Sequence, residues 1–394
     1  MSSQIRKYTF LNIAVALFFL ASPIESISVF ENFSIAKLSA LFVILGWATQ
    51  GFKSNHSTII KSYVVMATYA TASIIWSIER SGTVNQVVMF LWPSIIVSMA
   101  MFYSVRKIDD IYLYLKSFII GCIIAAISTL MFRDATLAVA EYAGQDRLTA
   151  FGQDQNTLAF LLCIGCTIVL DSFKKTTKSL QKYVSMGLLL VFVLVILSTG
   201  SRTGLILTFL VFLLYFISSG SIKNFLLVIT LVIVLAPFVY NYIPDSIWDR
   251  FLQTNDLVES GNFSDRGDTW SAGLSAFKDE NFLFGVGYSN FSTMLHKHFG
   301  WQMASHNTYL SYLVDFGYIG SFFFLYILFI MSKIVMKIYK QHKDVYIFAY
   351  LIPFLIVMFV LETENKRWIF MFGVLFECYY RMYLNMSKPN AQKN

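Results

Sequence analysis

Long apolar stretches run through the whole chain and restrict it to one class of fold. A helix that crosses a bilayer needs about 20 mainly apolar residues, and the 394 residues contain about 12 such stretches. They lie near residues 8–25, 34–51, 62–78, 87–104, 111–131, 157–172, 184–199, 204–219, 223–241, 315–336, 345–361 and 367–385. Only 13% of the residues are charged, which is too few to cover the surface of a soluble globule of this size. The sequence therefore predicts an all-α, polytopic transmembrane helix bundle that forms a single membrane domain over residues 1–394.

The net charge of +7 is explained by membrane topology and needs no nucleic-acid partner. Lysines and arginines concentrate in alternate loops: Arg6, Lys7, Lys53, Lys61, Arg106, Lys107, Lys174, Lys175, Lys178, Lys182, Lys223, Lys333, Lys337, Lys340, Lys343, Arg381, Lys388 and Lys393. Because loops rich in Lys and Arg stay in the cytoplasm, both termini are predicted to be cytoplasmic.

This orientation places the two longest loops, 132–156 and 242–306, on the extracytoplasmic side. Long connections often carry function, so the chemistry is expected to face outward, with the 242–306 loop capping the active site. Ser264 and Asp265 are candidate N-caps for an amphipathic helix in this loop, whose apolar positions are Trp270, Leu274 and Phe277. A purely structural cap over the bundle explains the same pattern.

Three arginines on the predicted outer side are candidate ligands for an anion. Arg202 lies in a short polar break between two apolar spans, Arg266 opens the amphipathic helix, and Arg147 lies in the 132–156 loop. Guanidinium groups bind phosphate in a bidentate manner, so their convergence on one diphosphate is the functional hypothesis. Separate contacts with lipid headgroups are the structural alternative.

His306 is the most informative titratable residue, because it directly precedes Asn307 and the start of an apolar helix. A neutral imidazole accepts a proton near pH 7, which suits a general base. A structural histidine at a helix start is the alternative, and the neighbouring arginines favour the catalytic role. The Cys163-Ile-Gly-Cys166 spacing resembles a redox or zinc half-site, but no second ligand pair accompanies it, so these cysteines are expected to be packed apolar residues of a membrane helix. No His-rich or carboxylate cluster with metal-ligand spacing accompanies His306, so no metal site is predicted.

His306–Asn307, followed after nine residues by Gly317–Tyr318–Ile319–Gly320, resembles the signature of the bacterial O-antigen ligases. Four further elements are similar to the wider O-antigen ligase and polymerase superfamily. They are Trp76–Ser77–Ile78, Asp154-x-Asn156-x-x-Ala159, Ser201–Arg202–Thr203–Gly204, and Arg266 to Trp270 with the Phe284–Gly285-x-Gly287 turn. The elements follow the family's order over residues 76–320.

The resemblance implies a GT-C-like, inverting glycosyltransferase that uses no metal and no cofactor. Such enzymes transfer a glycan en bloc from an undecaprenyl-diphosphate carrier to a sugar hydroxyl. His306 would be the general base, Arg202 and Arg266 would bind the diphosphate, and Arg147 would be a third contact. Asn307 would orient the imidazole or bind sugar, and the outer aromatics Trp270, Tyr288, Trp301 and Tyr309 offer stacking faces for sugars or anchor the membrane interface.

The acceptor stays open at this point. A polymerase uses a second lipid-linked repeat unit, a ligase uses lipid A–core, and a related oligosaccharyltransferase uses a protein side chain. We expect a polymerase, because no separate soluble domain or basic docking tract is evident. The resemblance also implies the bacterial inner membrane, an active site facing the periplasm, membrane-lipid contacts and a chain-length regulator as a further partner.

A transporter or lipid flippase is the competing class. Such proteins place ionisable residues near the bilayer midplane and show internal repeats. Here the embedded candidates are Glu377 and, nearer a span end, Asp171, and no repeat is visible. A structural or receptor protein would not require the set of arginines and histidine.

Overall fold

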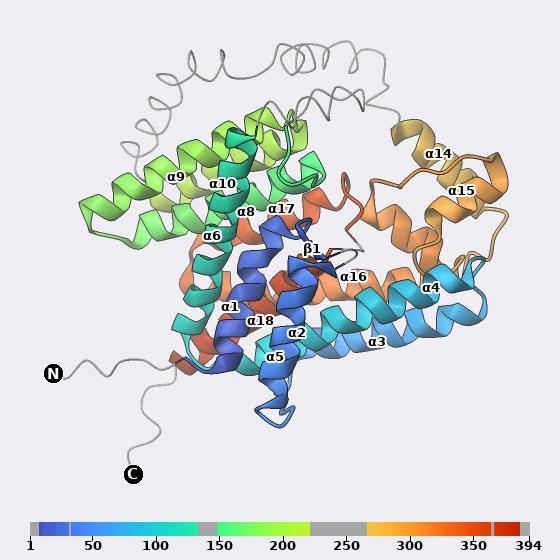
Figure 1. Cartoon of the computed structure of the whole chain (residues 1–394), viewed down its shortest axis with the longest axis horizontal. Helices are drawn as coiled ribbons and strands as arrows, with labels where there is room; N and C mark the ends of the chain where they lie inside the picture. The colour runs from blue at the N-terminus through green and yellow to red at the C-terminus, as the bar shows by residue number, and fades with distance from the viewer. Residues whose placement is uncertain (1–7, 31–32, 133–147, 221–265, 364–365, 387–394) are drawn as a thin grey trace.

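Helices make up nearly all of the described chain (Figure 1). The computed structural model describes residues 8–30, 33–132, 148–220, 266–363 and 366–386. The elements of the first part are α1 (Phe10–Ala21), η1 (Ser22–Ile24), β1 (Ser28–Phe30), β2 (Phe33–Ser34), α2 (Ile35–Ala48), α3 (Thr58–Ala72), η2 (Ser73–Ile75), α4 (Arg80–Gln86), η3 (Val87–Leu91), α5 (Trp92–Ser104) and α6 (Ile108–Met131). Those of the second part are α8 (Gln155–Lys175), α9 (Ser179–Ser198), α10 (Arg202–Ser219), α14 (Arg266–Phe277), α15 (Phe291–Phe299), α16 (Thr308–His342), η4 (Val345–Ile347), α17 (Phe348–Val357) and α18 (Arg367–Met386).

The predicted all-α membrane bundle is confirmed. Each predicted span that falls on described residues coincides with a helix or a continuous helical run, whereas span 223–241 lies outside the described residues. Within the described residues, seven helices are long and apolar enough to cross a membrane, and the apolar runs Phe10–Ile24, Ile35–Ala48 and Val345–Val357 are shorter. The predicted total of about 12 spans is therefore not confirmed.

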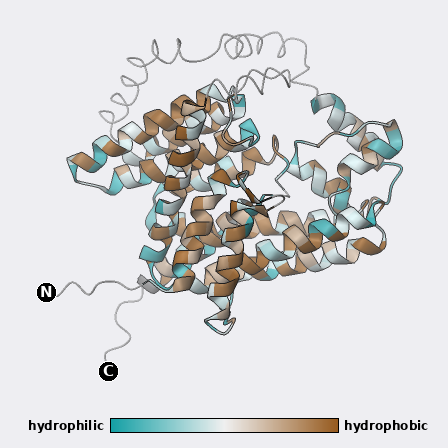
Figure 2. Ribbon diagram, in the orientation of Figure 1, coloured by the Kyte–Doolittle hydropathy of each residue, from teal (hydrophilic) through white to brown (hydrophobic). Residues whose placement is uncertain are grey.

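Hydrophobic residues predominate along the long helices (Figure 2). Their buried side chains form one continuous core between these helices. Helix α8 lies at the centre of this core, since 83% of the most apolar 18-residue stretch of the helix is buried. Gly165 on α8 lets Phe192 and Cys122 approach its backbone closely, as small residues commonly do between membrane helices. All four cysteines are free and buried, in agreement with a packing role.

Glu377, the predicted embedded carboxylate, caps a neighbouring helix. Its two oxygens accept hydrogen bonds from Ser57 Oγ (2.6 Å), Thr58 N (2.8 Å) and Ile59 N (3.0 Å) at the start of α3. A carboxylate suits this position because a helix N-terminus carries unpaired N–H groups and partial positive charge. Glu377 therefore joins α18 to α3.

Helix α16 contains the break that positions the outer part of the chain. Gly317 interrupts it with φ +63° and ψ −167°, in a region that is open almost only to glycine. The freed backbone bonds to the segment between α14 and α15: Val286 N donates to Val314 O (3.0 Å), and Tyr318 N donates to Phe282 O (2.9 Å). The short helices α14 and α15 thereby lie against the first turns of α16, at one side of the bundle in Figure 1.

Candidate functional site

Two of the sequence motifs meet behind the site and form a rigid support. The indole Nε1 of Trp76 donates to Phe284 O (3.1 Å), and Ile78 N donates to Val286 O (3.0 Å). Gly287 lies so close to Ser77 that a Cβ at Gly287 would lie 2.6 Å from Ser77 Cβ. The Gly-x-Gly turn is therefore explained by close packing against the turn that follows η2 and needs no phosphate ligand.

Asn290 and Asp315 complete this support from inside. Asn290 Nδ2 donates to Ser77 Oγ (2.9 Å) and to Thr83 Oγ1 (2.8 Å). The Asp315 carboxylate, fully buried, accepts from the backbone amides of Ser289 (2.8 Å) and Asn290 (3.0 Å). Buried polar groups with satisfied hydrogen bonds specify one geometry, so this network holds the outer segment on α16 in one position.

The other two motifs interlock at the start of α8 and α10. Ser201 caps α10, accepts from Gly204 N (3.2 Å) and donates to Asn156 Oδ1 (2.9 Å). A Cβ on Gly204 would lie 2.6 Å from Ala159 Cβ. A glycine at 204 and a small residue at 159 are therefore required where α10 crosses α8. The pairing places half-buried Arg202, the first residue of α10, beside the N-terminus of α8.

His306 lies directly before Asn307, the N-cap of α16, in a constrained backbone conformation. Its φ is +48°, a left-handed value that is uncommon outside glycine and often marks functional sites. On either side, Trp270 Nε1 donates to Ser305 O (2.8 Å), and Asn307 caps α16 by accepting from Leu310 N (3.1 Å). The imidazole is thus presented from a turn fixed at both ends.

The turn that follows α17 holds the same segment from the other side. Thr308 N donates to Met358 O (2.7 Å), and Thr308 Oγ1 lies 2.7 Å from Thr363 Oγ1. Ser311 Oγ donates to Glu362 Oε1 (3.4 Å), which brings a carboxylate to the first turn of α16. These contacts place the loop after α17 beside His306.

His306, Arg266 and Asp154 lie within electrostatic reach of one another. Burial lowers the pKa of His306, the Arg266 guanidinium lowers it further, and the Asp154 carboxylate opposes both effects. Burial also lowers the pKa of Arg266, while Asp154 favours its charged form. The structure therefore places an imidazole of lowered pKa, a half-buried guanidinium and a carboxylate, from three separate segments, within electrostatic reach of one another.

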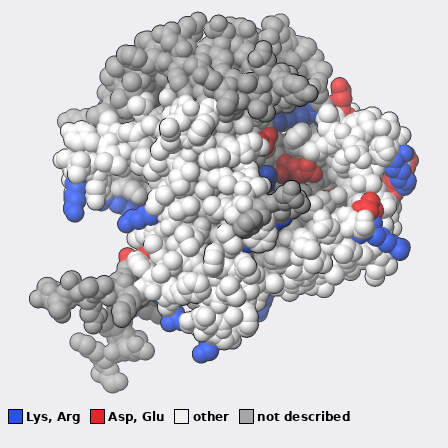
Figure 3. Space-filling model, in the orientation of Figure 1, with Lys and Arg blue, Asp and Glu red and all other residues white. Residues whose placement is uncertain are grey.

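This group forms where helix N-termini converge. Arg266 is the first residue of α14, and Asp154 caps α8 by accepting from Thr157 N (2.8 Å). His306 lies two residues before the first residue of α16. Helix N-termini attract anions through their free N–H groups and dipoles. Figure 3 shows a hollow in this face of the molecule between the bundle and the α14–α15 part, with acidic and basic side chains in and around it.

The structure places the remaining predicted residues as follows. Trp270 and Asn307 support the His306 turn through the bonds given above, and Tyr309 donates its hydroxyl to Leu355 O (3.1 Å). Arg147, Ser264 and Asp265 lie outside the described residues. Helix α14 forms where the amphipathic pattern predicts it, with Phe277 buried and Leu274 exposed.

Two carboxylates near the site received no role from the sequence. In the sequence Asp154 stands out only as part of a motif. Its place at the start of α8 does not indicate that it lies near Arg266 and His306. Glu362 lies 56 residues after His306, in the turn that follows α17, and no sequence pattern around it indicates a site residue. Only the folded arrangement of α8, α14 and α16 places these groups together.

Among the described residues, no group of three or more His, Cys, Asp or Glu side chains is close enough to hold a metal ion. The polar groups gathered at converging helix N-termini define a polytopic membrane protein with a candidate anion-handling site.

Residues 187–325 match a family model described as O-antigen ligase, from within α9 to the middle of α16. The match covers part of the chain and is consistent with the resemblance to the O-antigen ligase and polymerase superfamily. Arg202, Arg266 and His306 all lie inside the matched region. The family indicates a glycosyltransferase-like enzyme with a function like that of O-antigen ligases or polymerases. No curated protein matches the chain.

Proposed function

We propose that this protein is an inverting, metal-independent glycosyltransferase that moves a glycan en bloc from undecaprenyl diphosphate to a sugar hydroxyl. The observation that carries the proposal is the pairing of His306 with Arg266 beside the N-terminus of α8. One group accepts a proton, and the other binds an anion. A transporter requires neither group in this arrangement.

His306 acts as the general base. Because burial and Arg266 lower the pKa of His306 below its ordinary value of 6.5, the imidazole is neutral at pH 7 and ready to accept a proton. The acceptor oxygen forms a bond to the anomeric carbon while its proton passes to the imidazole. The bond from that carbon to the diphosphate oxygen breaks, and the electron pair leaves with the diphosphate.

Arg266 and Arg202 bind the departing diphosphate. Charge on the leaving group grows during the reaction, and fixed guanidinium groups and helix N-termini stabilise that growing charge. Partial burial strengthens the attraction, since the effective dielectric constant falls away from water. In the same proposal Arg147 supplies a third contact, and Asn307, Tyr309 and Trp270 support the imidazole or the acceptor sugar.

We place the protein in the bacterial inner membrane, with both termini in the cytoplasm and the site facing the periplasm. The acceptor we propose is a second lipid-linked repeat unit, which makes the protein a polymerase of O-antigen, capsule or exopolysaccharide. A chain-length regulator is the further partner that we propose for such a polymerase. A ligase that transfers the glycan to lipid A–core is the second candidate, favoured by the description of the matching family.

A deletion strain distinguishes the two acceptors through its surface glycan. Loss of long chains, with one repeat still attached to lipid A–core, is the result expected for a polymerase. Intact polymer that accumulates on undecaprenyl diphosphate identifies a ligase. An unchanged surface glycan, with no change in lipid-linked intermediates, contradicts both.

A further inference from the structure

A cavity of about 240 Å³ lies at the opposite end of the bundle from the candidate active site. Its walls come from α6, α8, α16, α17 and α18, and the residues at its mouth include Lys175 at the end of α8 and His342 at the end of α16. The candidate active site lies at the start of these same two helices. Helix α8 is 21 residues long, so about 30 Å separates the cavity from Asp154.

The interior of this cavity is suited to hydrocarbon. Leu115, Ile338, Leu375 and Phe376 line it together with further aliphatic and aromatic side chains. The exposed lining is mainly apolar, although four tyrosines and the charged groups at the mouth also contribute to it. The volume equals that of about eight water molecules, which admits part of a lipid chain and excludes a glycan repeat unit.

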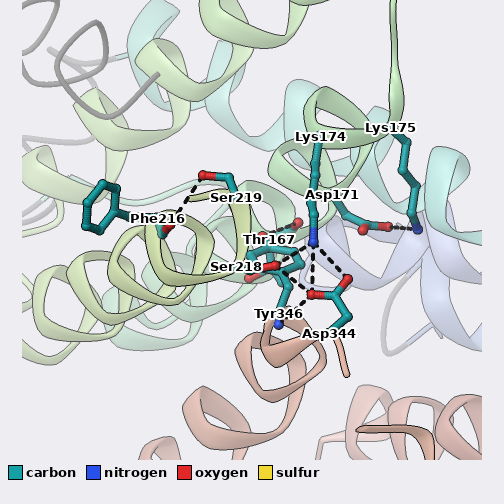
Figure 4. A network of polar contacts seen from close by, with 9 residues as sticks. All are labelled: Thr167, Asp171, Lys174, Lys175, Phe216, Ser218, Ser219, Asp344 and Tyr346. Carbon is teal, nitrogen blue, oxygen red and sulfur yellow. Dashed lines mark hydrogen bonds and ion pairs between the residues drawn. The ribbon is translucent and has the colours of Figure 1, made fainter. Parts of the chain in front are cut away.

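The mouth of the cavity carries two ion pairs side by side (Figure 4). Lys175 Nζ lies 2.6 Å from Asp171 Oδ2, and Lys174 Nζ lies 2.8 Å from Asp344 Oδ2. Ser218 Oγ also donates to Asp344 Oδ1 (2.6 Å). Each carboxylate is therefore neutralised by a lysine, so the mouth does not attract a cation.

Hydrogen-bond donors at this mouth favour an anionic group. Tyr350 lines the cavity, and its hydroxyl has no hydrogen-bond partner within the described part of the chain. Lys175 and His342 line the same space. Further lysines lie near the ends of α8 and α16 and the start of α9, outside the cavity lining: Lys174, Lys182, Lys337 and Lys340. Basic pockets between membrane helices are known sites for anionic lipid headgroups.

We propose that this cavity binds an anionic phospholipid of the surrounding leaflet. Part of one acyl chain occupies the apolar interior, and the phosphate lies at the mouth, next to Lys175, His342 and Tyr350. The lipid fills the space between α6, α8, α16 and α18 and so stabilises the bundle. This proposal is independent of the reaction at His306.

The test uses the purified full-length protein in mild detergent, stripped of lipid. Native mass spectrometry counts bound phosphatidylglycerol as it is added back, and the apparent Tm is followed in parallel with phosphatidylglycerol or phosphatidylcholine. The variants are Lys175→Gln and Tyr350→Phe, which keeps the ring and its packing. Lys178→Gln is the matched control, because it removes one lysine from the same end without lining the cavity.

The wild type is expected to retain one phosphatidylglycerol and to gain more stability from it than from phosphatidylcholine. Lys175→Gln lowers this affinity about tenfold through loss of a charge-assisted hydrogen bond, and Tyr350→Phe lowers it less. The control binds like the wild type. Equal binding in all four proteins, or equal stabilisation by both lipids, overturns the proposal. Displacement of the phospholipid by stoichiometric undecaprenyl phosphate also overturns it, because the cavity is then a carrier site.

Discussion

Replacement of Gly317 by alanine tests whether the Gly-x-x-Gly signature supports the site mechanically. At φ +63° and ψ −167° an alanine is strained by about 1–3 kcal/mol. Its Cβ would also lie 2.5 Å from Leu283 C and O and 2.6 Å from Gly285 N, all backbone atoms that cannot move aside separately. Relief of this clash separates the segment 282–287 from α16.

That separation costs the backbone hydrogen bonds that join the two segments. Val286 N–Val314 O, Gly287 N–Asp315 O, Tyr318 N–Phe282 O and Ile319 N–Leu283 O span 2.9 to 3.2 Å, and each contributes about 1 kcal/mol. With the strain included, we expect Gly317→Ala to lower the free energy of unfolding by about 5–7 kcal/mol, a large part of the 5–15 kcal/mol typical of folded proteins.

The assay is thermal unfolding in detergent, followed by tryptophan fluorescence, together with glycan transfer by the same preparation. Gly300→Ala is the matched control, because Gly300 has φ +78° but nothing within 4 Å of its added Cβ. The control should lose only about 1–2 kcal/mol and keep its activity. If Gly317→Ala unfolds at the same temperature as Gly300→Ala and loses only transfer, the mechanical interpretation is refuted, and the glycine belongs to the reaction itself.

Three further predictions concern charge. Arg266→Gln removes a group that lowers the pKa of His306, so the pH below which the transfer rate falls should rise. Asp154→Asn removes a group that raises the pKa of His306, so this pH should fall. A shift in the same direction for both variants contradicts the assignment of His306 as the base. Arg202→Ala and Arg266→Ala should raise the KM for the lipid-linked donor, as measured in steady-state transfer, whereas Lys178→Gln at the other end should not, and equal effects argue against diphosphate binding. Glu377→Gln should lower the free energy of unfolding by about 1–2 kcal/mol through weaker capping of α3, with activity retained in the folded fraction; an unchanged apparent Tm contradicts the capping role.

The hydrophobic pattern predicted the helices well. The apolar stretches mark the spans because each helix satisfies its own backbone hydrogen bonds, which is a local property. Helix α14 was predicted from Trp270, Leu274 and Phe277 for the same reason, and it forms over Arg266–Phe277. The break at Gly317 was not predicted, since it depends on a partner segment some 30 residues earlier.

Some residues of the candidate site were likewise predicted from the sequence, and others were not. His306 and Arg266 were selected from the sequence because their residue types suit the chemistry, and the structure brings them together. Asp154 and Glu362 were missed as site residues because their positions depend on how α8 and the turn after α17 pack against α16. The motifs around Ser77, Gly287 and Gly204 proved to be close-packing positions, which no local pattern separates from ligand-binding glycines.

The central claim is tested most directly by transfer with purified His306→Ala and a synthetic undecaprenyl-diphosphate glycan, with and without a sugar acceptor. The account predicts that this variant inserts and unfolds like the wild type, binds the lipid-linked donor, and forms no elongated product. Near-normal product formation by His306→Ala would remove His306 as the base and contradict the proposed mechanism.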